Sequence, residues 1–158
     1  MTPITYLQGD ATAPTAPGQK IIAHCCNNIG QWGAGFSGAV ADRYPEAERL
    51  YRQWYRGDLR KLFRLGEVQL VKLRPDLWVA NIIGQVGVRS PGNPTPIRYD
   101  ALRRGLHSVG TEAGLLRASV HLPRLGCGLA GGDWRQVERI ITEELSYWGV
   151  PVTVYDLP

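Results

Sequence analysis

The alternation of hydrophobic and polar positions predicts a first half made of two strands and two helices. Ile4–Leu7 alternates with polar neighbours and ends at a turn, which predicts a strand. Lys20–Cys26 is apolar and bounded by turn residues, as is typical of a buried strand. Ser37–Arg43 predicts a short helix, and Glu46–Arg56 predicts a second helix with Pro45 at its first position.

The second half predicts a strand pair followed by two longer helices. Glu67–Lys72 and Trp78–Ile83 are apolar, β-branched runs separated by the turn signal Arg74-Pro75-Asp76, so we expect antiparallel strands. The other predicted elements are a loop at Gly84–Pro96, a helix at Arg98–Gly114, a strand at Ser119–Leu122, a loop at Pro123–Gly132, a helix at Asp133–Trp148 and a strand at Pro151–Tyr155. This order predicts an α/β fold: a mixed sheet with helices on both faces. A length of 158 residues suits a single domain spanning residues 1–158.

Composition narrows the class of protein. The chain is 44% hydrophobic and 20% charged, which is typical of a folded globular protein. Its longest apolar runs are too short for a membrane span, and the N-terminal residues lack the features of an export signal. Cys25, Cys26 and Cys127 form neither a disulfide framework nor a zinc-site spacing. We therefore expect a cytoplasmic protein with reduced cysteines, no membrane partner, no metal and no cofactor.

The charge leaves a nucleic-acid partner open. The net charge is +4, from 18 basic and 14 acidic residues, and all but three of the basic residues are arginines. Arginine favours bidentate contacts with phosphate and carboxylate groups. An ordinary basic surface accounts for this charge, and nucleic acid or a small phosphorylated ligand are the alternatives. The chain has no basic helix and no platform of alternating aromatic and basic residues, so a nucleic-acid module is the last of the hypotheses.

A first glycine loop lies in His24–Gly38, "HCCNNIGQWGAGFSG", which contains the pattern G-x-G-x-x-G. A dinucleotide site requires this pattern directly after a strand, but Asn27–Trp32 intervenes here. Asp58, at the distance where an acidic residue would bind the ribose, follows a helix in a basic stretch. No Gly-Lys-Ser/Thr follows the glycines, which excludes a phosphate-binding P-loop. The remaining prediction is an anion held by backbone N–H groups where the loop enters a helix.

A second glycine loop strengthens this prediction. Leu122–Trp134, "LPRLGCGLAGGDW", also leads from a strand into a helix and carries four glycines. In an open α/β sheet, such loops meet at the carboxyl edge of the strands, where ligands bind. Two glycine loops at that edge predict an extended ligand with several phosphates, of which a diphosphate is the simplest.

The two loops together resemble those of the macro domain family of ADP-ribose-binding proteins. The resemblance covers the whole chain, from "ITYLQGD" through "IIAHCCNNIGQWGAGFSGAVADRYPEA" and "LPRLGCGLAGGDW" to "VTVYDL". The first loop is most similar to the branch that processes ADP-ribose 1''-phosphate. The resemblance implies a three-layer α/β/α fold and ADP-ribose, or a derivative of it, as the ligand.

The resemblance also implies the roles of individual residues. Asp10 would accept a hydrogen bond from the adenine amino group, and Tyr155 would flank the adenine. Asn28 and the Gly33–Phe36 backbone would surround the distal ribose, and Gly126–Gly132 would wrap the diphosphate. The complete implied set for ligand binding is Gly9, Asp10, Asn27, Asn28, Trp32, Gly33, Ala34, Gly35, Phe36, Leu125, Gly126, Cys127, Gly128, Leu129, Ala130 and Tyr155.

His24 and Asn28 are the predicted catalytic residues. The pKa range of histidine suits a general acid or base near neutral pH, and His24 ends a strand beside the first loop. The alternative is a histidine bonded to the neighbouring backbone. Cys127 has no identifiable base, which favours packing over nucleophilic chemistry. Asp133, with Gln136 three positions later, predicts a helix N-cap and capping box.

Besides the nucleic-acid module, three functions remain open, and all three use ADP-ribose. The leading hypothesis is a phosphatase that hydrolyses ADP-ribose 1''-phosphate to ADP-ribose and phosphate. The second is an ADP-ribosyl hydrolase acting on modified protein, nucleic acid or O-acetyl-ADP-ribose. One macro branch performs such a reaction with a lysine and an aspartate, but the matching positions here are Ile83–Val86 and Ala130, which excludes a covalent lysyl intermediate there. The third is a non-catalytic ADP-ribose reader.

Overall fold

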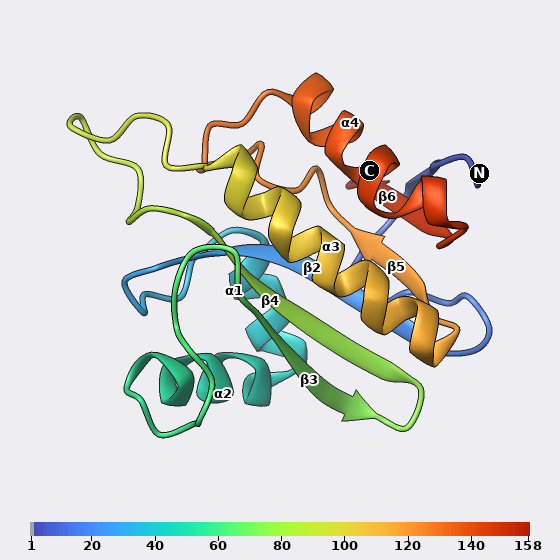
Figure 1. Ribbon diagram of the computed structural model, residues 1–158, viewed down its shortest axis with the longest axis horizontal. Coiled ribbons are helices and arrows are strands. Elements are labelled where there is room, and N and C mark those ends of the chain that lie inside the picture. Colours follow the sequence, from blue (N-terminus) through green and yellow to red (C-terminus); the bar gives the residue numbers. More distant parts are fainter. Residues whose placement is uncertain (1) are drawn as a thin grey trace.

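A six-stranded mixed sheet forms the centre of the computed structural model, which describes residues 2–158 (Figure 1). The strands are β1 (Thr5–Gln8), β2 (Lys20–Asn27), β3 (Val68–Arg74), β4 (Leu77–Gln85), β5 (Ser119–Leu122) and β6 (Val152–Asp156). Their order across the sheet is β1-β6-β5-β2-β4-β3. Neighbouring strands are parallel except β3, which is antiparallel to β4. The predicted mixed sheet and its antiparallel pair are therefore confirmed.

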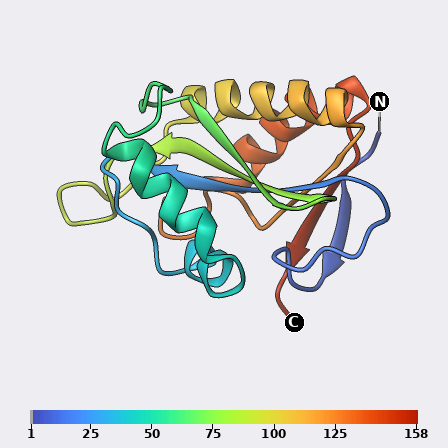
Figure 2. The same ribbon diagram turned by 90° about the horizontal axis from the view of Figure 1, so that it is seen from below.

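Helices cover both faces of the sheet. The helices are α1 (Phe36–Arg43), α2 (Pro45–Tyr55), α3 (Tyr99–Leu116) and α4 (Trp134–Glu144). Figure 2 shows α3 and α4 on one face and α1 and α2 on the other. This arrangement confirms the predicted three-layer α/β/α fold. Within residues 2–158, no helix is both long enough and apolar enough to cross a bilayer.

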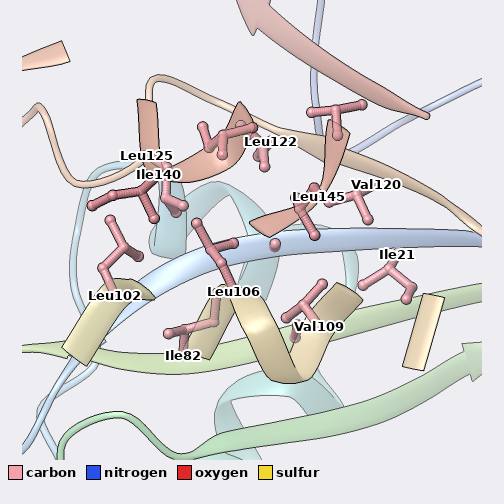
Figure 3. Packing of buried hydrophobic residues seen from close by; sticks show 14 of the residues in the cluster. Ile21, Ile82, Leu102, Leu106, Val109, Val120, Leu122, Leu125, Ile140 and Leu145 are labelled. Atoms are coloured by element: carbon pink, nitrogen blue, oxygen red, sulfur yellow. The ribbon is translucent and has the colours of Figure 1, made fainter. Parts of the chain in front are cut away.

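Alternating residues of the central strands build a core on each face. Ile21 is fully buried against the layer of α3 and α4, whereas the next residue, Ile22, is fully buried against the layer of α1 and α2. Successive side chains of a strand point to opposite faces, so a strand covered on both sides is apolar throughout. Figure 3 shows the larger core, in which Leu106 and Val109 of α3 meet Ile82 of β4 and Ile21. The strands that carry the cleft therefore have buried, fixed positions.

The predicted helix at Asp133–Trp148 is too long. α4 ends at Glu144, and a 3-10 turn, Ser146–Trp148, follows it. Leu145 is fully buried, and Gly149 has a φ of +78°, a left-handed conformation that suits glycine and turns the chain towards β6. The apolar stripe continues into this turn, which explains why periodicity extended the helix.

The predicted start of α4 is correct in its N-cap but not in its capping box. The Asp133 carboxylate accepts a hydrogen bond from the Arg135 N–H group at 3.0 Å. The Asp133 N–H group, however, donates to the Tyr99 hydroxyl at 2.9 Å, so a neighbouring helix replaces Gln136 as its partner. The predicted loop at Gly84–Pro96 also begins later, because β4 continues to Gln85.

Candidate functional site

A cleft of about 710 Å³ opens at the carboxyl ends of β2, β4 and β5, where the two glycine loops meet. In open α/β sheets this edge is the usual place for ligands. The residues predicted from the sequence that line the cleft are His24, Asn27, Trp32, Gly33, Ala34, Gly35, Phe36, Leu125, Gly126, Cys127, Gly128, Leu129 and Ala130. The structure therefore brings both predicted loops to one cavity.

The first wall of the cleft is the start of α1. The helix begins after Gly35, and no side chain caps it. The backbone N–H groups of residues 33–38 have no acceptor within residues 2–158. Free N–H groups at a helix N-terminus, aligned with the helix dipole, attract anions.

The second loop supplies another row of backbone donors. The N–H groups of Gly126 and of residues 128–130 also lack acceptors in the described part of the chain. The loop is closed by a hydrogen bond from the Gly132 N–H group to the Gly126 carbonyl at 2.8 Å. Both walls of the cleft therefore offer uncharged donors, an arrangement suited to an extended anion such as a diphosphate.

The glycines of the second loop have different physical reasons. Gly126 has a φ of +72°, and a Cβ there would lie 2.5 Å from Cδ1 of Ile97, so the fold itself requires glycine. Gly128 has no positive φ, and no atom of the described chain lies within 4 Å of the position a Cβ would take. The fold does not require glycine at position 128, and the absence of a side chain leaves the backbone there open to the cleft.

His24 lies in β2 with only 2% of its surface exposed. Its Nδ1 accepts a hydrogen bond from the Ser37 hydroxyl at 3.0 Å, and its Nε2–H group donates to Oδ1 of Asn81 at 2.5 Å. Asn81 is oriented by its own bond from Nδ2 to Oε1 of Gln69 at 3.0 Å, which assigns this tautomer. Burial lowers the pKa of His24 from 6.5 to about 4. His24 is therefore neutral at neutral pH, and its predicted proton transfer to substrate stays a prediction.

Asn27 and Asn28 point to different places. Asn27 lines the cleft and is buried, and its Oδ1 accepts from the Gln31 N–H group at 3.1 Å and from the Tyr51 hydroxyl at 3.0 Å. The Asn28 side chain accepts from the Gly87 N–H group at 2.9 Å and lines a separate groove of about 1020 Å³ beside α3. Of the two asparagines, the structure brings Asn27 to the cleft, and a catalytic role for Asn28 stays a prediction.

The residues predicted to hold adenine gather at the β1–β6 edge, outside the lining of the cleft. A Cβ at Gly9 would lie 3.4 Å from the Tyr155 ring, and the Tyr155 hydroxyl is hydrogen-bonded to Nδ1 of His121 at 2.7 Å. The Asp10 carboxylate accepts from the Thr12 hydroxyl at 2.7 Å and from the Thr12 N–H group at 2.9 Å, which lowers the pKa of Asp10. Asp10 therefore forms a turn, and adenine binding there stays a prediction.

Trp32 is fixed in the wall of the cleft. Its Nε1 donates to the Ser37 carbonyl at 2.7 Å, and its ring meets the His24 ring edge-on at 5.2 Å between centroids.

Cys127 does not have the properties of a nucleophile. Burial raises the pKa of its thiol to about 11, so the thiol stays protonated, which favours a packing role over nucleophilic chemistry. Within residues 2–158, no group of three or more His, Cys, Asp or Glu side chains is placed to hold a metal ion.

Several residues that line the cleft were not among the predicted site residues. Gln85 lies at the end of β4, and Arg89 lies in the loop that follows β4. Arg124 lies between the end of β5 and the glycines of the second loop. Ser37 was known only as part of a helix. The signal for Gln85 and Arg89 would have been the parallel pairing of β4 with β2, which brings the loops after both strands to the same sheet edge.

The comparisons with known proteins point to one fold. No protein-family model matches the chain. The solved structure of a macrodomain protein from Streptomyces coelicolor matches with a TM-score of 0.88 and 49% sequence identity. The match covers 99% of this chain and 100% of that one.

Curated relatives are similar over almost the whole chain. ADP-ribose 1''-phosphate phosphatase from Saccharomyces cerevisiae is 41% identical, over 99% of this chain and 100% of its own length. ADP-ribose glycohydrolase OARD1 from Homo sapiens is 27% identical, over 98% of this chain and 91% of its own length. Chromodomain-helicase-DNA-binding protein 1-like from Mus musculus is 32% identical over 99% of the chain, but the chain spans only 18% of that relative's length. The chain likewise spans only 16% of the length of the Danio rerio protein of the same name.

Proposed function

The chain belongs to the macro domain family, and from this premise we propose that it binds ADP-ribose and hydrolyses ADP-ribose 1''-phosphate to ADP-ribose and phosphate. The observation that carries the proposal is the cleft with unpartnered backbone N–H groups on both walls, at residues 33–38 and at Gly126 and 128–130. Similarity along the full length of a phosphatase named for this substrate supports the choice of reaction.

The strand order, together with the residues predicted to hold adenine, supports one direction for the bound ligand. In this proposal the N–H groups of Gly126 and residues 128–130 hold the diphosphate, and the Gly33–Phe36 backbone surrounds the distal ribose. The adenosine extends towards the β1–β6 edge, where Gly9, Asp10 and Tyr155 lie. The distal ribose extends the other way, towards Asn27 at the end of β2 and Gln85 at the end of β4.

In the proposed reaction water attacks phosphorus and the P–O bond to the ribose breaks, so that the ribose leaves with its 1''-oxygen and takes up the proton that the water loses. Phosphoryl transfer depends chiefly on positioning and on stabilisation of charge. The cleft offers donors for both, and no carboxylate lines it within residues 2–158. His24 acts on the site indirectly. Its Nδ1 accepts a hydrogen bond from the Ser37 hydroxyl, and this bond fixes the first turn of α1. We infer a positioning role for His24 because both ring nitrogens already have partners.

A single assay pair tests this proposal. ADP-ribose binding is measured by calorimetry, and phosphate release is measured after incubation with ADP-ribose 1''-phosphate. Binding together with release above a buffer control is the expected result. Absence of ADP-ribose binding would remove this function and both alternatives together.

A non-catalytic reader of ADP-ribose is the second candidate. The observation that favours it is the lack of a carboxylate among the described cleft residues, together with the buried, neutral His24. Tight ADP-ribose binding with no product from any substrate would select this function.

An ADP-ribosyl hydrolase is the third candidate, and its partner would be an ADP-ribosylated macromolecule or an acetylated ADP-ribose. Similarity to a relative named ADP-ribose glycohydrolase supports it. Ala130 is 6% exposed and offers no side-chain nucleophile or base, so the reaction would be non-covalent at that place. Release of free ADP-ribose from a modified protein or nucleic acid, without phosphate release, would favour this activity.

We propose the cytoplasm as the compartment in which these reactions occur. The three cysteines are all free thiols, which supports a reducing environment. Cell fractionation with an antibody against the chain tests this placement, and recovery outside the cytosolic fraction would contradict it.

A further inference from the structure

Two arginines are the cationic side chains that line the cleft within residues 2–158, and they differ in their partners. Arg124 is committed: its guanidinium makes two hydrogen bonds to the Asp156 carboxylate, both at 2.9 Å, and lies 4.8 Å from the centroid of the Trp134 ring. Arg89 is exposed and has no hydrogen bond or ion pair to any other described residue. The cleft therefore holds one guanidinium whose charge is not already neutralised.

The loop that carries Arg89 is anchored beside the first glycine loop. The Gly87 N–H group donates to the Asn28 side chain at 2.9 Å. The Asn93 amide donates to the Val86 carbonyl at 2.7 Å and to the Val88 carbonyl at 3.1 Å. Figures 1 and 2 both show this loop, coloured yellow-green, running out past the end of β2. Arg89 thus lies at the β2–β4 end of the cleft, on a backbone held by two asparagines.

We propose that Arg89 recognises the 1''-phosphate of the substrate and sets the preference for ADP-ribose 1''-phosphate over ADP-ribose. This inference rests on the proposed function and on the ligand direction proposed with it. A phosphomonoester carries between one and two negative charges at neutral pH and presents a face of oxygens that a guanidinium binds in a bidentate manner.

Most of the remaining contacts are common to the two ligands. ADP-ribose and its 1''-phosphate share the adenosine, the diphosphate and the distal ribose, so donors that meet only these groups do not distinguish them. Specificity is a difference between two affinities, and it needs a group that meets only the additional phosphate. Arg89 is the unpaired cation at the end of the cleft where that phosphate lies.

The test compares Arg89→Gln with the unchanged protein on both ligands. The expected result is that kcat/KM for ADP-ribose 1''-phosphate falls about 10- to 100-fold, mainly through KM, because a hydrogen-bonded charge contact is lost. The calorimetric affinity for ADP-ribose stays within about twofold. Arg139→Gln is the matched control, since Arg139 is an exposed arginine on α4 outside the cleft. We expect the control to change neither quantity.

The outcomes separate this inference from the proposed function. If the unchanged protein releases no phosphate, the affinities for both ligands are measured directly by calorimetry, and Arg89 is tested by binding alone. Loss of affinity for the phosphorylated ligand only, with an unchanged melting temperature, supports the assignment. An equal loss of affinity for both ligands, or no change in either affinity, overturns the assignment. Arg89→Lys is expected to give an intermediate value because it keeps the charge but loses the planar fork.

Discussion

Gly128 separates the needs of the ligand from the needs of the fold. Because the space around its α-carbon is open, Gly128→Ala leaves the fold intact but places a methyl group where the diphosphate approaches the backbone. We expect ADP-ribose affinity to fall by about tenfold or more, as overpacking of a close contact costs about 1–3 kcal/mol. Calorimetry and the melting temperature together measure the effect.

A control for Gly128 lies on the far side of the molecule. Gly114 is an exposed helical glycine of α3, also with open space around it. Gly114→Ala should raise the free energy of unfolding by up to about 1 kcal/mol and leave ADP-ribose affinity unchanged. If Gly128→Ala binds ADP-ribose as well as the unchanged protein does, the diphosphate does not lie against this loop.

Ser37 tests the inferred positioning role of His24. Ser37→Ala leaves Nδ1 of the buried imidazole without a donor. We expect the free energy of unfolding to fall by about 1–3 kcal/mol, since an unsatisfied buried polar atom carries its full desolvation cost. Urea denaturation measures this change, with Ser108→Ala on the exposed face of α3 as the control. An unchanged stability would mean that His24 and Ser37 are not coupled.

At the scale of the element, local patterns predicted what local physics decides. Alternation and apolar runs located β2, β4 and α3, because each buries a face of its own regular repeat. The end of α4 could not be found in this way. It depends on Leu145 turning into the core and on Gly149 in a left-handed conformation, both of which follow from the path to β6.

The N-cap of α4 gives a prediction for this element. Asp133→Ala should lower the free energy of unfolding by about 1 kcal/mol, because its carboxylate satisfies a free N–H group in the first turn. Asp133→Asn, which retains a capping oxygen, should stay close to the unchanged protein. The two variants are compared by urea denaturation, and equal stability of Asp133→Ala and the unchanged protein would argue against this cap.

The sequence predicted the loops of the site better than its side chains. Both glycine loops line the cleft. They could be found from the sequence because a run of glycines indicates backbone that a ligand can approach closely. The directions of Asn27 and Asn28 were not predictable, since a register shift after Cys26 pairs Asn27 with Gln85 and sends Asn28 towards Gly87. The partners of His24 were equally hidden, because Asn81 lies 57 residues away in the sequence.

For the whole molecule, two buried histidines make stability depend on pH. Burial lowers the pKa of both His24 and His121 from 6.5 to about 4. Between pH 6.5 and 4 the unfolded chain binds protons that the folded chain does not, so the free energy of unfolding falls as the pH falls. This stability is present in full above pH 6.5, and the contribution of His24 is roughly 3 kcal/mol.

Denaturation at several pH values measures this dependence. His24→Gln should make the curve between pH 6.5 and 4 less steep. A stability that is constant over this range in the unchanged protein would contradict the neutral, buried state of both histidines.

The single domain predicted for residues 1–158 remains a prediction, and one cooperative transition in the same experiments would support it.

The proposed function requires that the cleft hold ADP-ribose 1''-phosphate while water cleaves its phosphate. Its most direct test is the initial rate of phosphate release from this compound with increasing ADP-ribose present. We predict that each molecule of substrate releases one phosphate. We also predict that ADP-ribose inhibits the release competitively, because the two compounds occupy the same donors. Tight ADP-ribose binding with no phosphate above the buffer control would contradict the claim.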